Sequence, residues 1–75
     1  MLLPNKLYSY EESVLSKLPF LLTVLRQTPI SVLELYQKSS AKFSGVSEFI
    51  DALDCLYALG RIDFDEKEDV LNYVV

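Results

Sequence analysis

Two aspartates, Asp51 and Asp54, lie three residues apart in a segment whose apolar residues recur with helical spacing. Residues three apart share one face of a helix, so both carboxylates would project from the same side. Paired carboxylates can serve acid–base catalysis or bind a hard cation, and both uses need a cleft that excludes water. A chain of 75 residues has little volume for such a cleft. We therefore interpret Asp51 and Asp54 as a solvated or partner-facing acidic surface.

The other residue types also argue against an enzyme. Histidine is absent, so the chain lacks the usual general base and the commonest metal ligand. Cys55 is the only cysteine and has no imidazole to activate it. The acids of residues 63–69 lack the ordered spacing and central glycine of a calcium-binding EF-hand loop. With Gly45 and Gly60 as the only glycines, a glycine-rich phosphate loop is excluded. We expect no enzymatic activity, no cofactor and no metal.

Apolar residues recur at spacings of three and four along three segments, which predicts three helices. The predicted helices cover residues 10–27, 32–39 and 45–59. The third has the clearest apolar stripe, formed by Val46, Phe49, Ile50, Leu53, Leu56 and Tyr57. Ser9 and Ser31 each precede a glutamate by three residues, the capping-box pattern of a helix start. Gly60 follows the third helix at the position where a left-handed residue ends helices.

Two prolines affect the first helix. Pro4 disfavours helix at the residue before it, so we expect residues 1–8 to form an extended arm. Pro19 lies inside the helical pattern, where a proline removes one backbone hydrogen bond. We expect either a helix over 10–27 that is disturbed near Pro19, which we favour, or a shorter helix capped by Ser16.

After Gly60, Ile62 and Phe64 alternate with aspartates, which is the period of a half-buried strand. Residues 61–65 and 70–75 are predicted to pair as a hairpin around an acidic turn. The fold is therefore predicted to be mainly α with a small β-hairpin (α+β). It would be one winged-helix-like domain over residues 1–75, three helices followed by a C-terminal two-stranded wing. The alternative is a three-helix bundle with an irregular tail.

The charge is uneven in a way that argues against direct nucleic-acid binding. Residues 1–47 carry five basic and three acidic side chains (+2), and residues 48–75 carry two basic and eight acidic ones (−6), for a total of −4. In a helix-turn-helix the second helix enters the major groove. Its outward positions here would be Ser47, Glu48, Asp51, Asp54, Cys55 and Ala58. None is one of the residue types that supply the commonest base contacts, and the acidic turn would repel phosphate.

Hydrophobic residues make up 51% of the chain, which is more than so small a core can bury. The surplus must lie on the surface, where an apolar patch usually marks a partner or a second copy. The predicted apolar contact residues are Leu2, Leu3, Tyr8, Tyr10, Tyr73 and Val75, with Asp51 and Asp54 providing polar specificity. No apolar window is long enough to span a membrane, no signal-peptide pattern is present, and one cysteine fits a reducing compartment. We expect a cytoplasmic protein that does not contact membranes.

Three stretches together carry a family resemblance. They are Leu3-Pro4-Asn5-Lys6, Ser31-Val32-Leu33-Glu34-Leu35-Tyr36, and the helix end Ala52-Leu53-Asp54 with Leu56-Tyr57-Ala58-Leu59-Gly60. With these motifs the chain resembles the small middle component of bacterial ABC-three-component systems, of the type numbered six. Pro19 and the glycine-free turn at residues 66–69 depart from the pattern of that family.

The resemblance implies a non-enzymatic adaptor. Such a protein would link a chromosome-maintenance-like ABC ATPase to an effector subunit in a bacterial defence-type system, by protein–protein contacts. Two alternatives remain. One is a DNA-binding winged-helix regulator that uses a basic face from residues 1–42, and the other is a structural homodimer.

Overall fold

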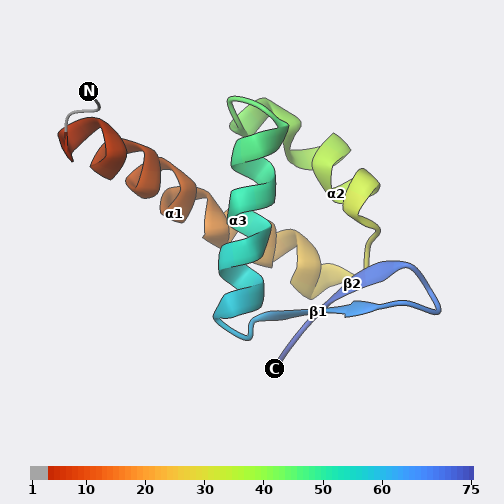
Figure 1. The fold of residues 1–75 in the computed structure, drawn as a ribbon. Coiled ribbons are helices and arrows are strands. Elements are labelled where there is room, and N and C mark those ends of the chain that lie inside the picture. Colours follow the sequence, from red (N-terminus) through yellow and green to blue (C-terminus); the bar gives the residue numbers. More distant parts are fainter. Residues whose placement is uncertain (1–3) are drawn as a thin grey trace.

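The computed structural model describes the backbone of residues 4–75 and the side chains of residues 9–75. Three helices are followed by a two-stranded antiparallel hairpin, which confirms the predicted fold class (Figure 1). The elements in chain order are α1 (Pro4–Gln27), α2 (Val32–Ser39), the 3₁₀ turn η1 (Ser40–Lys42), α3 (Val46–Ala58), β1 (Ile62–Asp65) and β2 (Val70–Tyr73).

Helix α1 begins at Pro4, so the prediction of an extended arm is wrong for residues 4–8. Proline is well tolerated at the first helical position, because the N–H that it lacks would have no helical partner there. Ser9 consequently lies inside the helix and does not begin it. Residues 1–3, the rest of the predicted arm, are outside the described part of the chain.

The helix continues through Pro19 without ending. Thr23 Oγ1 donates a hydrogen bond to the Pro19 carbonyl at 2.9 Å, one turn further on. Ser16 Oγ donates to the Ser13 carbonyl at 2.8 Å and therefore does not cap a shorter helix. Because a proline has no N–H, the Leu15 carbonyl lacks the helical hydrogen bond that residue 19 would otherwise donate to it.

The core lies along one side of α1. Four of its residues, at spacings of four, three and four, are buried: Val14, Leu18, Leu21 and Leu25. Helices α2 and α3 and strand β2 all contact α1, and α1 crosses behind α3 in Figure 1. The other buried apolar side chains are Ile30, Leu35, Phe43, Phe49, Ala52, Leu53, Leu56, Ile62 and Leu71, and all of them join one cluster. The Phe49 ring packs on Tyr36 and Phe43 at centroid distances of 4.9 and 5.5 Å.

Gly60 turns the chain from α3 into the hairpin. Its φ of 71° is in the left-handed region that glycine adopts without strain. The Gly60 N–H donates to the Tyr57 carbonyl at 3.0 Å, and the Arg61 N–H donates to the Leu56 carbonyl at 2.9 Å. These two bonds form a Schellman motif, which satisfies carbonyls at the helix end and directs residue 61 into β1.

The hairpin is held to the helices by the connector between α1 and α2. Ile62 pairs with Tyr73 and Phe64 pairs with Leu71 in the antiparallel register. On the other side of β2, Ile30 and Leu71 exchange two backbone hydrogen bonds, of 3.2 and 2.7 Å. Ile30 and Leu71 are both buried, so this bridge anchors the wing in the core.

The turn of the hairpin needs no glycine because aspartates take over its role. Asp65 Oδ1 accepts from the N–H groups of Lys67 and Glu68, at 2.9 and 3.2 Å. Asp69 adopts a φ of 55°, and aspartate is one of the few side chains that tolerate this left-handed conformation. The glycine-free turn is thus compatible with a regular hairpin.

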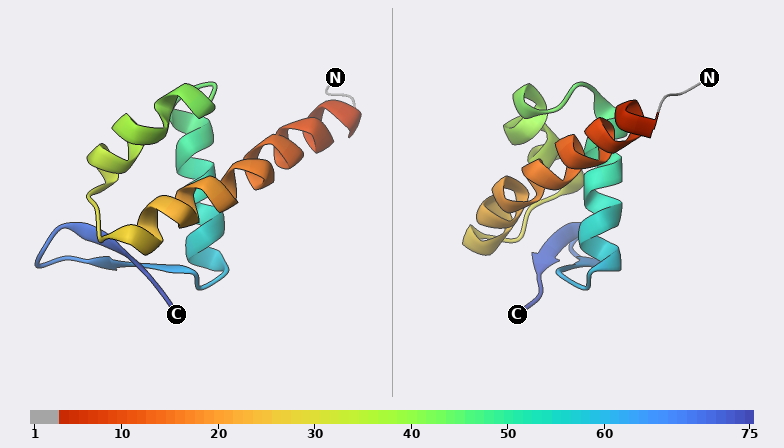
Figure 2. Two further views of the ribbon diagram at one scale, coloured as in Figure 1. Left: turned by 180° about the vertical axis from the view of Figure 1, so that it is seen from behind. Right: turned by 90° about the vertical axis from the view of Figure 1, so that its left-hand side faces the viewer.

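The molecule is elongated, with extents of 44 × 23 × 20 Å. The elongation comes from α1, whose N-terminal turns extend past the other elements in the left view of Figure 2. Only its later turns are surrounded by α2, α3 and the hairpin. The N-terminal half of α1 therefore offers an exposed surface next to α3.

We expect Leu21→Ala to destabilise the fold by about 2–5 kcal/mol, because the fully buried Leu21 side chain fills the centre of the core and its loss leaves a cavity. Urea unfolding followed by circular dichroism measures this change. The matched control is Leu33→Ala, since the Leu33 side chain is 66% exposed, and its effect should stay within about 0.5 kcal/mol. Equal effects of the two substitutions would contradict the described core.

Candidate functional site: a groove between two helices

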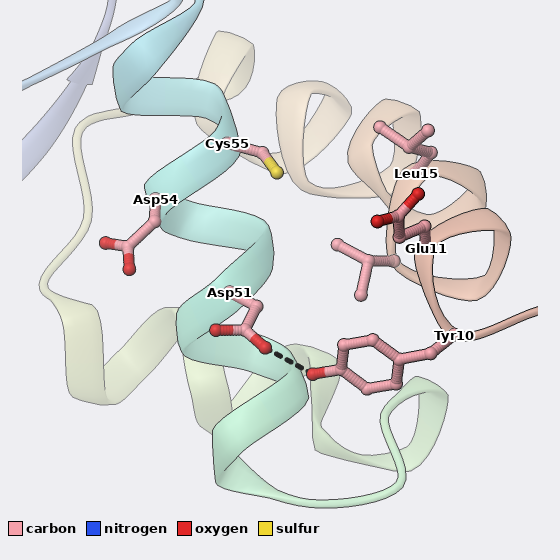
Figure 3. Close-up of a pocket in the computed structure, with 7 residues that line it drawn as sticks. Tyr10, Glu11, Leu15, Asp51, Asp54 and Cys55 are labelled. Carbon is pink, nitrogen blue, oxygen red and sulfur yellow. Dashed lines mark hydrogen bonds between the residues drawn. The ribbon is translucent and has the colours of Figure 1, made fainter. Parts of the chain in front are cut away.

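An open groove lies between the N-terminal half of α1 and the middle of α3 (Figure 3). Its volume is about 440 Å³. We call it the acidic groove, and it is lined by Tyr10, Glu11, Val14, Leu15, Asp51, Asp54 and Cys55. Three of these residues are acids and none is basic, so any group that enters the groove meets a negative rim.

Helical spacing places these residues on facing surfaces. On α1, Tyr10 and Val14 are four residues apart, as are Glu11 and Leu15, and residues so spaced lie on the same side of a helix. On α3, Asp51, Asp54 and Cys55 are related by steps of three and four. Val14 is buried and reaches the core, whereas the Leu15 side chain is 54% exposed. The groove therefore combines a wall on α1 that is mainly apolar apart from Glu11 with a mainly polar wall on α3.

Tyr10 and Asp51 connect the two walls. The Tyr10 hydroxyl donates a hydrogen bond to Asp51 Oδ2, as Figure 3 shows. This bond raises the pKa of Tyr10 to about 12, because ionisation would lose the bond and place a negative phenolate beside the Asp51 carboxylate. Both residues are among the predicted partner contacts, and the structure brings them together. Asp54 also lines the groove, with its carboxylate turned away from Tyr10 (Figure 3).

A second polar contact fixes the crossing of α1 and α3. Glu48 is only 4% exposed, and its carboxylate lies 2.5 Å from Lys17 Nζ. Ser13 Oγ and the Ser44 N–H also donate to this carboxylate, each at 3.1 Å. The hydrogen bond from Lys17 is the main cause that lowers the pKa of Glu48, and the bonds from Ser44 and Ser13 lower it further against the effect of burial.

Glu48 was expected on the outward face of the third helix, and that prediction is wrong. Its carboxylate finds a cation and two further donors inside the structure, so burial leaves no unpaired charge. Sequence reasoning missed this site because Lys17 and Glu48 are 31 positions apart. The signal that could have found it is the pair Ser13 and Lys17, four residues apart and thus on one side of α1.

A second hollow continues the acidic groove along the same two helices. It has a volume of about 380 Å³. We call it the apolar groove, and it is lined by Leu15, Leu18, Pro19, Leu22, Leu56, Leu59 and Arg61. Leu15 belongs to both hollows. Leu15, Pro19 and Leu22 form a second apolar stripe on α1, next to the buried one, and the chain itself leaves this stripe partly uncovered.

The remaining predicted contact residues lie elsewhere. Tyr73, on β2, is half-buried, and the guanidinium carbon of Arg26 lies 5.5 Å from the centre of its ring. The Tyr73 hydroxyl accepts a hydrogen bond of 3.4 Å from Arg61 Nη2. Val75 is fully exposed after the hairpin. Leu2 and Leu3, and the side chain of Tyr8, are outside the described residues.

The outer face of α3 differs from the predicted one. Cys55 points toward α1 and is half-buried in the acidic groove, not outward (Figure 3). Val46, Ile50 and Tyr57, which the sequence pattern placed on the apolar stripe, are 57%, 41% and 59% exposed. We call these three residues the outer strip. The negative charge of the two acids beside this strip would repel phosphate.

Several chemistries find no support in the geometry. In the part of the chain that the structure describes, no three histidine, cysteine, aspartate or glutamate side chains gather as metal ligands would. Nor does any described helix have the length and apolar character needed to cross a membrane. The grooves supply apolar surface and fixed negative charge, which suit the binding of another polypeptide.

The family model of the ABC-three component (ABC-3C) system Middle Component 7 matches residues 3–71. The resemblance drawn from the sequence motifs named the same class of component but its sixth type, and the sixth type is not confirmed. No curated protein and no solved structure matches the chain.

The bond between Tyr10 and Asp51 predicts that the Tyr10 hydroxyl titrates at a raised pH. In a near-ultraviolet absorbance titration, Asp51→Asn should return the pKa of Tyr10 from about 12 toward its ordinary value of 10.0. Because the folded pKa is raised, the bond stabilises the fold below pH 10 and this contribution is lost as the pH rises through 12. Asp54→Asn is the matched control and should leave the titration unchanged. A titration unaffected by Asp51→Asn would exclude the bond.

Removing the charge of Lys17 should weaken the fold strongly. Lys17→Met leaves the Glu48 carboxylate buried without its cation, and we expect a loss of about 3 kcal/mol at neutral pH. Lys38→Met, which removes a positive charge from the exposed surface of α2, should change the free energy of unfolding by less than about 0.5 kcal/mol. Urea unfolding of both variants measures the difference.

The pH dependence of the same contact provides an independent check. The folded pKa of Glu48 lies below its ordinary value of 4.5, so the contact contributes fully above pH 4.5 and is lost as the pH falls through the lowered pKa. Glu48→Gln should therefore be less stable than the unmodified chain at pH 7, and the gap should narrow below pH 4.5. A gap that is constant with pH would show that Glu48 does not act through its charge.

Proposed function

The chain belongs to the Middle Component 7 family of ABC-three component systems, and from this membership we propose that it is a non-enzymatic adaptor. In this role it links an ABC-type ATPase to an effector subunit through protein–protein contacts, in a bacterial defence-type system in the cytoplasm. Its family supports a place among several components. The two grooves and the outer strip support a role in protein contact and not in catalysis.

The observation that carries the proposal is apolar surface left uncovered beside α3. Leu15 and Leu59, which line the apolar groove, are 54% and 64% exposed. Isolated exposed apolar side chains are common in proteins, but here they join a continuous hollow with Leu18, Pro19 and Leu22. Such hollows, rimmed by polar groups, are typical of protein contact sites.

An adaptor for two partners needs two separate surfaces, and α3 provides both. Each residue turns a helix by about 100°. By this rule the outer strip of Val46, Ile50 and Tyr57 lies on a different side of α3 from Cys55, which faces α1. One partner can therefore occupy the grooves while another contacts the outer strip. This separation favours a bridging role over a simple homodimer, which needs only one self-complementary surface.

The polar specificity of the adaptor is assigned to Asp51 and Asp54. Both acids are exposed on α3 and lie between the grooves and the outer strip. No basic residue lines the acidic groove beside these two acids. Lys17 pairs with Glu48, and Lys42 Nζ lies 4.7 Å from the centre of the Phe20 ring. A negative α3 surface favours a basic partner and disfavours DNA.

Affinity purification of the tagged chain from its own cells, with mass spectrometry of what is retained, tests the adaptor role. We expect a stoichiometric ABC-type ATPase, and we expect Asp51→Lys with Asp54→Lys to abolish its retention while circular dichroism shows an intact fold. The charge-matched control is Glu66→Lys with Glu68→Lys in the hairpin turn. Recovery of this chain alone after gentle lysis at low salt would refute the adaptor and favour the homodimer.

A further inference from the structure

We propose that the acidic and apolar grooves together bind an amphipathic helix of a partner protein, whose apolar face enters between α1 and α3 and whose flank is basic. The inference rests on the adaptor function and adds the chemistry of the partner segment. It concerns the side of α3 that faces α1, and the outer strip takes no part in it.

The shape of the site fits a helix. The acidic groove follows residues 10–15 of α1 and 51–55 of α3, and the apolar groove follows residues 15–22 and 56–61. From the acidic groove to the apolar groove, the residue numbers of the lining rise on both the α1 side and the α3 side. Leu15 lines both hollows and joins them into one path. A helix that lies in such a path presents apolar side chains at positions i, i+4 and i+7.

The uncovered stripe on α1 has the same spacing. Leu15, Pro19 and Leu22 are themselves at i, i+4 and i+7, and the chain covers them only in part. Pro19 is fixed in the helix, so its ring presents a rigid apolar surface. Facing it, Leu56 is buried and forms the floor, while Leu59 is exposed at the rim. Two helices with matching stripes can interdigitate over this length.

Charge selects the flank of the bound helix. Glu11 on one wall and Asp51 and Asp54 on the other are not offset by any basic residue that lines the acidic groove. A helix with lysine or arginine on its flank would neutralise this rim, whereas an acidic helix would add like charges at close range. At the other end of the path the lining includes Arg61, so the basic flank belongs at the acidic end.

Charge also argues against a second copy of this chain as the occupant. The chain has a net charge of −4, and residues 9–16 of α1, most of which are exposed, carry Glu11 and Glu12 and no basic residue. A second copy of this segment would bring two more carboxylates to a rim that already holds three. A basic helix from a different protein is therefore the better fit.

Cys55 provides a direct readout of occupancy. It is the only cysteine of the chain, it lines the acidic groove, and its sulfur points toward α1 (Figure 3). A helix seated in the groove would cover this thiol, so alkylation of Cys55 by N-ethylmaleimide should slow when the groove is filled. The readout needs only the full chain and no ATPase.

The experiment compares two designed peptides of about 14 residues, each with leucines at i, i+4 and i+7. One has a lysine flank and the other has the same flank in glutamate. We expect the lysine peptide at about ten times its Kd to slow alkylation of Cys55 about tenfold, and added salt to reduce the effect. The glutamate peptide should give no protection. Equal protection by both peptides, or none by either, would overturn the proposal.

Variants of the chain locate the effect. Glu11→Lys with Asp54→Lys should weaken the lysine peptide by about tenfold or more, and Leu15→Asp should weaken it through the apolar wall. Glu66→Lys with Glu68→Lys carries the same charge change outside the grooves and should bind normally. Protection that survives both groove variants would overturn the proposal. If the lysine peptide binds as expected but no ATPase is retained from cells, the adaptor role is refuted. The binding of a basic amphipathic helix in the grooves is then still supported.

Discussion

The buried stripe of α1, formed by Val14, Leu18, Leu21 and Leu25, is the surface against which α2, α3 and β2 pack. A chain of this size buries only roughly 60% of its unfolded surface, so its stability depends on this single core. The polar contact of Lys17 with Glu48 sets how α3 crosses that stripe. A fault in α1 would therefore affect every other element.

The same helix carries the candidate site. Val14 is buried in the core and the next residue, Leu15, lies exposed in the groove, so the same helix builds both the fold and the candidate site. Because α1 contributes to both the core and the groove, 75 residues can form a core and still offer apolar surface on two sides of α3. It also means that the groove has rigid walls, since neither α1 nor α3 can shift without breaking the core packing or the Lys17–Glu48 contact.

Features set by neighbouring residues could be predicted from the sequence, and features set by distant ones could not. The bounds of α2 and the left-handed Gly60 depend on local spacing and capping, and the structure has them where the pattern indicates. The hairpin forms around the acidic turn as predicted, but its strands cover residues 62–65 and 70–73 instead of 61–65 and 70–75. The start of α1 was missed because Pro4 is compatible with both an extended arm and a first helical turn. In the site, Asp51 was recognised as an exposed acid, but its bond to Tyr10 spans 41 positions and depends on how α1 crosses α3. The exposure of Val46, Ile50 and Tyr57 was missed for a related reason, since a broad apolar stripe does not show which part the neighbouring helices cover.

The bridge between Ile30 and Leu71 has a consequence for how the chain reaches its folded state. It joins the connector after the first helix to the last strand, and both residues belong to the core. Contacts so distant in sequence close late, because a long loop must first be ordered. During synthesis, α1 and α2 are therefore made well before the strand that completes their core. Until residue 71 is available, the part of the α1 stripe that β2 covers remains open to water, to chaperones or to a partner that is already folded.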